Sequence, residues 1–396
     1  MKSMKTLAVS GKRVLVRVDF NVPLDDKGNV TDDTRIRFVM PTITWLMENN
    51  ARVILCSHLG RPKGKPDPAF TLAPAAKRLQ ELLGKPVIMA DDCIGDKVTA
   101  MINGMKNGDV IMLENLRFHP GEADNDDGFA RTLAALCDIY INDAFAVSHR
   151  ANASVEAIVK HAPVCAAGLL LEKEITAFRT AMESPKRPLV AIVGGAKVSS
   201  KLKALYSILN SVDSMIIGGA MANTFLAAKG GKVGKSKIEP DLIEDARKIL
   251  AQAVEKKIAI YLPVDAMAAD SIDQKTPGQI VPIDSIPDQA MVLDIGPATV
   301  SLFAGIIAGA GTVIWNGPMG IFETPVFAAG TNGVAEAVAK TGAYTIAGGG
   351  DTVAAVEAAG VTDKLSYIST GGGAFLSLME GEPLPGVAVL EKQCGA

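Results

Sequence analysis

Short apolar runs rich in valine, isoleucine and leucine alternate along the whole chain with segments of helical spacing. This alternation is typical of α/β proteins, in which helices cover both faces of a parallel sheet. In the first half we expect strands at 13–18, 52–57, 86–90, 109–113 and 138–142. In the second half we expect them at 189–193, 214–218, 259–263, 291–295, 312–316, 344–348 and 365–369.

The number of predicted strands indicates two sheets, because a single open twisted sheet rarely exceeds about ten strands. A length of 396 residues also favours more than one domain. Between the halves, Leu170, Glu174, Phe178 and Met182 have helical spacing, and Pro185 and Pro188 follow them. We therefore predict two Rossmann-like lobes, 1–168 and 186–383, joined by a hinge helix at 169–185. An ordinary crossover helix within one domain is the alternative.

Composition narrows the class of protein. The chain carries 40 basic and 43 acidic residues, a balance that argues against a general binder of nucleic acid or membrane surfaces. No run approaches the roughly 20 apolar residues of a membrane helix, and the first residues do not resemble a signal peptide, so we expect a cytoplasmic protein. Five cysteines lie far apart without a C-x-x-C pair, which predicts reduced core thiols rather than disulfides or metal ligands.

Glycine-rich loops follow the strands of the second half. Ligands of open parallel sheets bind beyond the carboxyl ends of the strands. Glycine lets the backbone approach a ligand closely, and the N-terminus of a following helix attracts anions. These loops predict a nucleotide phosphate site, and their glycines are Gly194, Gly195, Gly218, Gly219, Gly317, Gly320, Gly348, Gly349, Gly350, Gly371, Gly372 and Gly373.

Charged residues accompany these glycines. In GGAKVSSK, Lys197 and Lys201 would lie one turn apart on the entering helix, where they could neutralise phosphate, although surface charge is the alternative. Asp351 follows three glycines directly and is a candidate ligand for Mg²⁺, which usually takes one or two carboxylates and the oxygens of its substrate. Its alternative role is an N-cap of the next helix.

Polar and basic loops follow the strands of the first half. Arginine binds carboxylates and phosphates through its planar fork, so several arginines at one sheet edge predict a small polyanionic substrate. Arg35 precedes a helix whose first turn we expect to hold Pro41, and a cation there is best explained by a nearby anion. A single arginine would more often be a solvated surface residue. The candidates are Asp19, Asn21, Arg35, His58, Arg61, Arg117, His149 and Arg150.

A nucleotide site and an anion site together favour phosphoryl transfer, which needs positioning and charge neutralisation. The chain lacks the HRD and DFG motifs of protein kinases and a G-x-G-x-x-G motif after a strand. A hinged two-lobed binding protein is the alternative from another class, but it would need an export signal. A catalytically silent kinase is the second alternative, and the intact Arg35, Lys197, Lys201 and Asp351 argue against it.

Eight motifs give the chain a resemblance to the phosphoglycerate kinase family over its whole length: RVDFNVP, SHLGRP, ENLRF, NDAF with SHRA, GGAKVSSK, WNGPMGIFE, GGGDTVAA and STGGGAFL. The resemblance implies a Mg²⁺-dependent kinase, usually monomeric. It would transfer a phosphoryl group between 1,3-bisphosphoglycerate with ADP and 3-phosphoglycerate with ATP after closure of the hinge. It also implies that residues 384–396 pack back onto the first lobe. The family often has Gly-Thr-Ala where this chain has Ala146, Val147 and Ser148.

The resemblance also implies roles for individual residues. The phosphoglycerate would be held by Asp19, Phe20, Asn21, Arg35, His58, Leu59, Gly60, Arg61, Arg117 and Arg150. The nucleotide would be held by Gly195, Lys197, Lys201, Gly219, Asn316, Pro318, Glu323, Gly348, Gly349, Gly350, Asp351 and Thr352, with Asp351 as the metal ligand. The migrating phosphoryl group would be stabilised by Arg35, Lys197, Lys201, Gly372 and Gly373.

Overall fold

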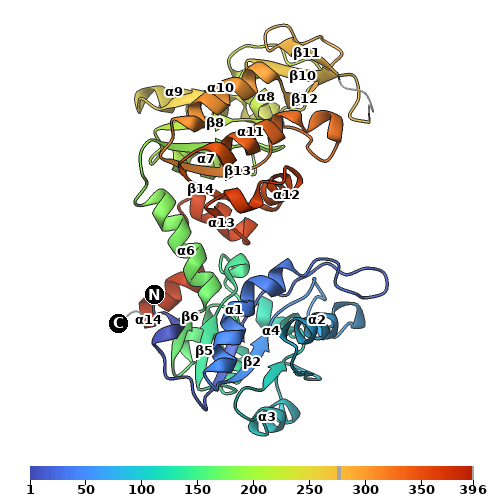
Figure 1. Cartoon of the computed structure of the whole chain (residues 1–396), viewed down its shortest axis with the longest axis vertical. Helices are drawn as coiled ribbons and strands as arrows, with labels where there is room; N and C mark the ends of the chain where they lie inside the picture. The colour runs from blue at the N-terminus through green and yellow to red at the C-terminus, as the bar shows by residue number, and fades with distance from the viewer. Residues whose placement is uncertain (274–277, 395–396) are drawn as a thin grey trace. The chain divides into compact units, whose positions relative to one another are not determined.

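The chain divides into two compact units (Figure 1). The computed structural model describes residues 1–273 and 278–394. Unit 1 contains Met1–Ile175 and the segment from Pro383 onward, and unit 2 contains Thr176–Glu382. The division falls inside helix α6 (Leu169–Met182), at the place where the sequence predicts a linking helix. The predicted α/β class with two lobes is confirmed.

Unit 1 is built on a six-stranded parallel sheet with the order β3-β4-β2-β1-β5-β6. All five strands predicted in the first half are present, and β6 was missed because Cys-Ala-Ala is short and lacks β-branched residues. The strands are β1 (Arg13–Arg17), β2 (Arg52–Cys56), β3 (Val87–Met89), β4 (Val110–Met112), β5 (Ile139–Asn142) and β6 (Cys165–Ala167). The helices are α1 (Thr34–Glu48), α2 (Ala73–Leu83), α3 (Asp96–Asn103), α4 (Pro120–Ala123), α5 (Asp127–Ala134) and α14 (Pro385–Cys394).

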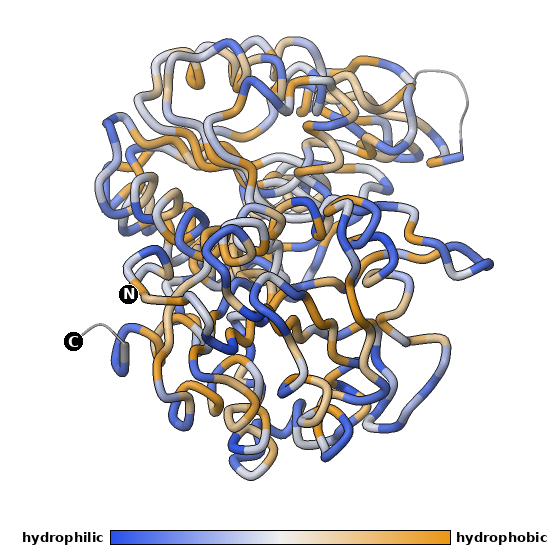
Figure 2. The backbone as a smooth tube through the Cα atoms, turned by 60° about the horizontal axis from the view of Figure 1, so that its bottom comes forward, coloured by the Kyte–Doolittle hydropathy of each residue, from blue (hydrophilic) through white to orange (hydrophobic). Residues whose placement is uncertain are grey.

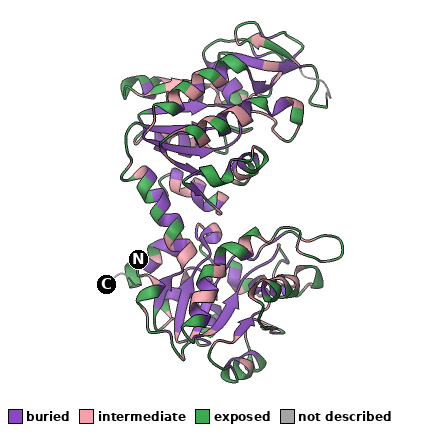
Figure 3. Ribbon diagram, in the orientation of Figure 1, coloured by how far each residue is buried: buried purple, intermediate pink, exposed green. Residues whose placement is uncertain are grey.

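Burial explains why the central strands of unit 1 are apolar throughout. Val14 of β1 is paired with Val53 on one side and with Ile139 on the other. All three side chains are buried, as expected for a parallel sheet that helices cover on both faces. Figure 2 shows hydrophobic stretches alternating with hydrophilic ones along the backbone, and Figure 3 shows the central strands as buried while the helices keep one face exposed.

Unit 2 contains a second six-stranded parallel sheet with the order β15-β14-β13-β7-β8-β9. Every strand of this sheet was predicted. They are β7 (Leu189–Val193), β8 (Ser214–Ile217), β9 (Ala259–Tyr261), β13 (Thr312–Asn316), β14 (Tyr344–Ala347) and β15 (Tyr367–Ile368). The helices are α7 (Leu202–Ile208), α8 (Gly219–Ala228), α9 (Ile243–Glu255), α10 (Pro297–Ala308), α11 (Ala329–Lys340), α12 (Gly350–Ala358) and α13 (Gly372–Met379).

A separate antiparallel sheet departs from the predicted pattern. It consists of β10 (Asp265–Ala269), β11 (Gln279–Pro282) and β12 (Met291–Ile295) in the order β11-β10-β12. The strand at 291–295 was predicted, but as part of a parallel sheet, and β10 and β11 were missed. The sequence of β10, DAMAA, is rich in alanine, which is depleted in strands, so pattern reasoning has no signal there.

The cysteines correct one prediction. Cys56, Cys93 and Cys137 are buried free thiols, as expected. Cys165 on β6 is disulfide-bonded, so the expectation that all five are reduced is wrong at this position. Sequence spacing carried no sign of the bond, because the chain has no pair of closely spaced cysteines. In the described residues, no helix is both long enough and apolar enough to span a bilayer.

Candidate active-site residues in the two units

The carboxyl ends of β1 and β2 bring Asp19, Asn21, His58 and Gly60 of unit 1 together, and Arg35 of α1 joins this group through Asp19. Asp19 is buried, and its Oδ2 accepts a hydrogen bond from Nη1 of Arg35. The other oxygen of Asp19 lies 3.8 Å from Nδ1 of His58. Oδ1 of Asn21 accepts a hydrogen bond of 2.8 Å from the backbone N–H of Gly60. We call this group, together with Arg61, Arg117, His149 and Arg150, the arginine site.

Arg35 lies inside α1 rather than ahead of it. The helix begins at Thr34, where the carboxylate of Asp32 accepts the backbone N–H of Thr34 at 2.9 Å. Pro41 lies in the interior of α1, so the expectation that it marks the first turn is wrong. The helix tolerates this proline although it removes one i→i−4 hydrogen bond. Arg35 is thus a cation in the first turn, where the helix dipole disfavours it unless an anion is close.

The loop after β4 supports the loop after β2. Asn115 is buried, and its side-chain amide donates to the carbonyls of Leu59 and Phe70 at 2.7 and 2.8 Å. Arg117 lies in the short 3-10 helix η3 (Leu116–Phe118) and donates from Nη1 to the carbonyl of Gly60 at 2.7 Å. Gly60 adopts a φ of +59°, and a Cβ there would collide with the ring of Phe70. These contacts hold the guanidinium of Arg117 beside the loop that carries His58.

Cations outnumber anions in the arginine site. Burial lowers the pKa of Arg117 to about 10, and the positive charges of Arg150 and Arg17 add to this shift. Burial also lowers the pKa of His58 well below its ordinary value, with the same arginines and Arg35 contributing. Asp19 is the carboxylate that directly pairs with Arg35 in this group. An electrostatic imbalance of this kind indicates a site for an anionic ligand.

Arg17 belongs to this arrangement, and sequence reasoning missed it. Its side chain is almost completely buried, and it donates from Nε to Oγ of Ser154 at 2.8 Å and from Nη2 to Nδ1 of His58 at 3.2 Å. The buried Glu122 lies 3.9 Å from Nη2 of Arg17 and accepts two hydrogen bonds from Ser154. The signal was present, because a charged residue inside the apolar run RVLVRV must be paired if it is buried.

The remaining candidates of the arginine site differ in exposure. Arg150 is exposed and donates from Nε to Nε2 of the partly buried His149 at 3.2 Å, and Arg61 is also exposed. Burial and the charge of Arg150 lower the pKa of His149. Phe20 and Leu59 have buried side chains that belong to the hydrophobic core. If Phe20 and Leu59 contact the substrate as predicted, they do so through backbone atoms and not through their side chains.

In unit 2, three glycine-rich loops pack against one another at the carboxyl ends of β7, β8 and β13. The backbone N–H of Gly195 donates to the carbonyl of Pro318 at 2.9 Å, and that of Gly219 donates to Met319 at 3.0 Å. A Cβ on Gly219 would lie 2.5 Å from the nitrogen of Gly195. Gly219 is therefore required by contact between the loops, whereas Gly195 is favoured by its φ of +106°. The sequence pattern did not distinguish these reasons from ligand binding.

Lys197 and Lys201 lie outside the helix that was expected to carry them. Helix α7 begins at Leu202, and Lys201 occupies its N-cap position. Gly195 has a φ of +106°, and a turn closed by Ser200, whose Oγ donates to the carbonyl of Lys197, precedes the helix. Local turn geometry therefore delays the start of the helix beyond the predicted position.

The two lysines also differ in environment. Nζ of Lys201 donates to the carbonyls of Gly194 and Asn316 at 2.7 and 2.9 Å. Burial lowers the pKa of Lys201 to about 8, while the negative charge of Asp351 acts in the opposite direction. Lys197 is exposed. Lys201 is thus fixed at the base of the glycine loops, and Lys197 extends from their surface.

The N-termini of α12 and α13 lie close together. A Cβ on Gly372, the first residue of α13, would be 3.4 Å from the nitrogen of Gly350, the first residue of α12. A Cβ on Gly350 would have no heavy atom within 4 Å, so the surroundings of Gly350 are open. The first backbone N–H groups of a helix have no partner within the helix and attract anions. Two such termini provide donors from two directions.

Buried side chains hold the loop before α12. Thr352 donates from Oγ1 to the carbonyl of Gly348 at 2.8 Å and accepts the N–H of Gly317 at 2.7 Å. Asn316 donates to the same carbonyl at 2.8 Å. Asn316 and Thr352, both predicted to contact the nucleotide, thus connect the ends of β13 and β14. Glu323 is an exposed carboxylate further along the chain after β13.

Asp351 is exposed in the first turn of α12, whose N-cap is Gly349. The alternative reading of Asp351 as the N-cap is therefore wrong. An exposed carboxylate at the mouth of two helix N-termini fits Mg²⁺ chemistry, because Mg²⁺ takes few protein ligands and completes its shell with phosphate oxygens and water.

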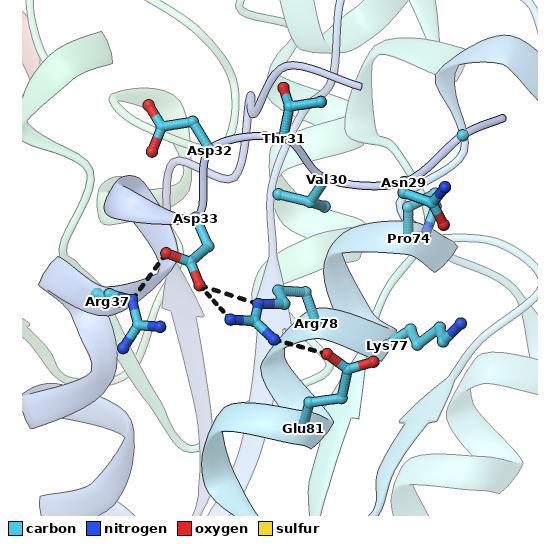
Figure 4. A pocket seen from close by; sticks show the side chains of 11 residues that line it. Asn29, Val30, Thr31, Asp32, Asp33, Arg37, Pro74, Lys77, Arg78 and Glu81 are labelled. Atoms are coloured by element: carbon cyan, nitrogen blue, oxygen red, sulfur yellow. Dashed lines mark hydrogen bonds and ion pairs between the residues drawn. The ribbon is translucent and has the colours of Figure 1, made fainter. Parts of the chain in front are cut away.

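A cavity of about 470 Å³ in unit 1 was not anticipated from the sequence (Figure 4). It lies between the loop at 28–33 and helices α1 and α2. Asp33 contacts both Arg37 and Arg78 at 2.7 Å, and Arg78 also contacts Glu81 at 2.7 Å. These arginines are neutralised by neighbouring carboxylates, so the cavity lacks the charge imbalance of the arginine site.

An arginine-lined sheet edge in one unit, and helix N-termini with a lysine at a sheet edge in the other, define a phosphotransferase of the α/β class. A sequence profile of the phosphoglycerate kinase family matches residues 4–382. The chain is 65% identical over 392 residues to the phosphoglycerate kinase of Desulfosudis oleivorans, covering 99% of both chains. It is 57% identical to that of Geobacter metallireducens, covering 97% of both chains.

Solved structures agree with this assignment. The phosphoglycerate kinase of Coxiella burnetii matches with a TM-score of 0.91 at 42% identity, and that of Pyrococcus horikoshii with a TM-score of 0.87 at 33% identity. Each match covers 99% of both chains. The chain belongs to the phosphoglycerate kinase family. It is a glycolytic kinase, and thus a phosphotransferase.

Proposed function

We propose that the arginine site of unit 1 binds 3-phosphoglycerate or 1,3-bisphosphoglycerate, and that the glycine loops of unit 2 bind ADP or ATP. The observation that supports the first half of this proposal is the position of Arg117, where burial lowers its pKa to about 10 and the positive charges of Arg150 and Arg17 add to that shift. A phosphate or carboxylate placed among these groups would remove their mutual repulsion. Binding of the anion is then favoured because its charge offsets the repulsion among these guanidinium groups.

His58 would contribute as a neutral hydrogen-bond donor. The guanidinium of Arg17 has donors and no acceptor, so Nδ1 of His58 must accept its hydrogen bond. Burial keeps the ring neutral by lowering its pKa. The single ring proton therefore resides on Nε2, which is left to donate to an oxygen of the substrate. Arg17 acts here as a positioning residue, since it sets the tautomer of His58.

The nucleotide phosphates would lie at the paired N-termini of α12 and α13. Lys201 is fixed at the base of the glycine loops by two carbonyl contacts, and its charge is only partly neutralised there. Asp351 would hold Mg²⁺, which supplies charge neutralisation to the phosphates when it is bound. The other proposed nucleotide contacts are Gly195, Gly219, Asn316, Pro318, Glu323, Gly348, Gly349, Gly350 and Thr352.

Transfer of the phosphoryl group would be stabilised electrostatically. The family's substrate is a carboxylate, which is already ionised at neutral pH, so no general base is needed. Arg35 from unit 1 and Lys197 with the amides of Gly372 and Gly373 from unit 2 would neutralise the charge on the migrating group. Because these groups belong to different units, we propose that the units close about α6 when both substrates are bound.

We further propose that the enzyme works as a monomer in the cytoplasm on small-molecule substrates, without nucleic acid or membrane partners. The near balance of 40 basic and 43 acidic residues supports the absence of nucleic acid. The glycolytic reaction of the family supports the compartment, because its substrates are phosphorylated metabolites of the cytoplasm.

The roles of Arg35 and Lys197 can be tested with matched variants. ³¹P NMR of a mixture with Mg-ATP and 3-phosphoglycerate should show the acyl phosphate, and Arg35→Ala and Lys197→Ala should each lower kcat by about 100-fold or more. Arg37→Ala and Lys203→Ala are the controls, because they remove exposed cations from α1 and α7 that pair with Asp33 and Glu382. Undiminished turnover in the first two variants would overturn the assignment.

A further inference from the structure

Three potential metal ligands meet at the sheet edge of unit 1, outside the arginine site. Asp92 and Cys93 lie between β3 and α3, and His119 follows η3 after β4. Strands β3 and β4 are parallel neighbours, with Val87 paired to Val110, so the segments after them emerge at the same edge. The backbone N–H of Glu114 donates to the carbonyl of Asp92 at 3.3 Å and joins the two segments.

The side-chain atoms of this group are close enough to share one ion. One ligand atom from each of Asp92, Cys93 and His119 lies within 4.8 Å of the others. Nε2 of His119 is 2.7 Å from Oδ1 of Asp92. Ligands of a tetrahedral ion with bonds of about 2.0–2.3 Å lie roughly 3.3–3.8 Å apart, so a small rearrangement would accommodate an ion. Among the side chains of residues 1–273 and 278–393, no second triplet of His, Cys, Asp or Glu ligand atoms comes as close.

The group is accessible from solvent at one end and fixed at the other. The Cys93 side chain is fully buried, whereas those of His119 and Asp92 are 28% and 47% exposed. The His119 ring stacks on Phe129 with a centroid separation of 5.4 Å, which limits its rotation. The backbone N–H of Cys93 donates to Oδ1 of Asp92 at 2.6 Å. An ion entering from solvent would meet ligands whose positions are already restricted.

Two other sites in the chain contain only part of this combination of ligands. His161 contacts Asp127 at the same 2.7 Å, but that pair has no cysteine beside it and is an ordinary surface contact. Cys137 is an equally buried thiol, and it donates to the carbonyl of Ala134 at 3.4 Å. The combination of thiol, imidazole and carboxylate distinguishes the group from both.

We propose that Asp92, Cys93 and His119 form a binding site for a thiophilic divalent cation of the Zn²⁺ type. A thiolate, an imidazole and a carboxylate with one water complete the four-coordinate shell that Zn²⁺ adopts. On binding, the metal–sulfur bond replaces the S–H bond of Cys93, and the proton leaves to solvent. The site is distinct from that for Mg²⁺, which prefers oxygen ligands and would be a poor partner for sulfur.

The proposal is tested by titrating metal-free, tag-free full-length protein with Co²⁺ and with Zn²⁺. Bound Co²⁺ should give the near-ultraviolet absorption of a thiolate–cobalt bond at one equivalent. Zn²⁺, measured by competition with a chromophoric chelator, should then displace it. Cys93→Ser and His119→Gln should each weaken Zn²⁺ binding by 100-fold or more, and Cys93→Ser should abolish the thiolate absorption.

Two control variants isolate the site. Cys137→Ser removes another buried thiol, and His161→Gln removes the matched surface histidine, so both should leave binding unchanged. If Cys93→Ser is unstable, His119→Gln alone decides, because its side chain is partly exposed. Absence of the thiolate–cobalt band in the wild type, or equal Zn²⁺ affinity in the wild type and His119→Gln, would overturn the proposal. Kinase activity in Mg²⁺ serves as the folding check, since these residues lie outside the proposed catalytic groups.

Discussion

The guanidinium of Arg17 donates a hydrogen bond of 3.2 Å to Nδ1 of His58, and both side chains are buried. We expect ¹⁵N NMR of the ligand-free enzyme to show His58 as the neutral tautomer protonated at Nε2, without titration between pH 6 and 8. The folded pKa of His58 lies below that of the unfolded chain, which binds more protons below about pH 6.5. This histidine therefore lowers stability as the pH falls through that value. A His58 titration centred near 6.5, or a proton on Nδ1, would refute the assignment.

Lys201 should impose an alkaline limit on nucleotide use. Its pKa is lowered to about 8, so the free enzyme loses this charge above that pH. We expect kcat/KM for the nucleotide to fall about tenfold per pH unit beyond pH 8. The control variant Lys203→Ala should show the same decrease of kcat/KM above pH 8. Lys201→Arg should remove the decrease, because arginine stays protonated. A wild-type profile that is flat up to pH 9.5 would rule out this role for Lys201.

The stability contribution of the same lysine has a defined sign. The folded pKa of Lys201 lies below its ordinary value of 10.5, so the unfolded state binds more protons between pH 8 and 10.5. Stability relative to Lys201→Met should therefore rise with pH across that window. Paired chemical denaturation curves of the two proteins at pH 7.5 and 10 would measure the change. An unchanged difference between the two pH values would contradict it.

Asp143 should control the start of the linking helix α6. Its buried Oδ1 accepts the backbone N–H groups of Leu170 and Leu171 at 2.8 and 3.0 Å. Asp143→Ala should cost about 1 kcal/mol and speed amide exchange at these two leucines. Asp143→Asn keeps an acceptor oxygen and is the matched control. Unchanged exchange in the alanine variant would show that the cap is dispensable.

The same residue predicts a pH dependence. Burial raises the pKa of Asp143 to about 6, so the folded state binds more protons than the unfolded state between pH 3.8 and 6. Stability contributed by this group is present at low pH and is lost as the pH rises through that window. The Asn variant lacks the titration, so it should gain up to about 3 kcal/mol on the wild type between pH 4 and 7. Denaturation curves that keep a constant separation would contradict this.

Two glycines in helices of unit 2 should respond oppositely to alanine. A Cβ on Gly330 would lie 2.3 Å from the buried carboxylate of Asp294, so Gly330→Ala should destabilise by about 2 kcal/mol or more. A Cβ on Gly305, inside α10, meets no heavy atom within 4 Å, so Gly305→Ala should stabilise by about 0.5–1 kcal/mol. Thermal unfolding of both variants provides the comparison, and equal shifts would exclude the packing explanation.

Pattern alone determined the α/β class, the two parallel sheets and the linking helix. Strands such as β1 and β7 are rich in apolar residues because helices bury both of their faces, so their composition alone indicates buried parallel strands. The carboxyl-end rule then placed Arg117, Arg150, Lys201 and Asp351 at the sheet edges without coordinates. The antiparallel strand β10 was not predicted, because its alanines give no periodic pattern of apolar and polar residues.

Only the tertiary structure determined how deeply each side chain is buried and which groups it contacts. Arg17 looked like one charge in an apolar run, and only folding showed that Glu122 and Ser154, more than a hundred residues away, make its burial possible. The helix starts differ from the prediction for another reason: Arg35 lies inside α1 and Lys201 precedes α7 because local turns and caps outweigh the spacing of apolar residues. Burial and pairing depend on atoms that are distant in sequence, so composition cannot reveal them.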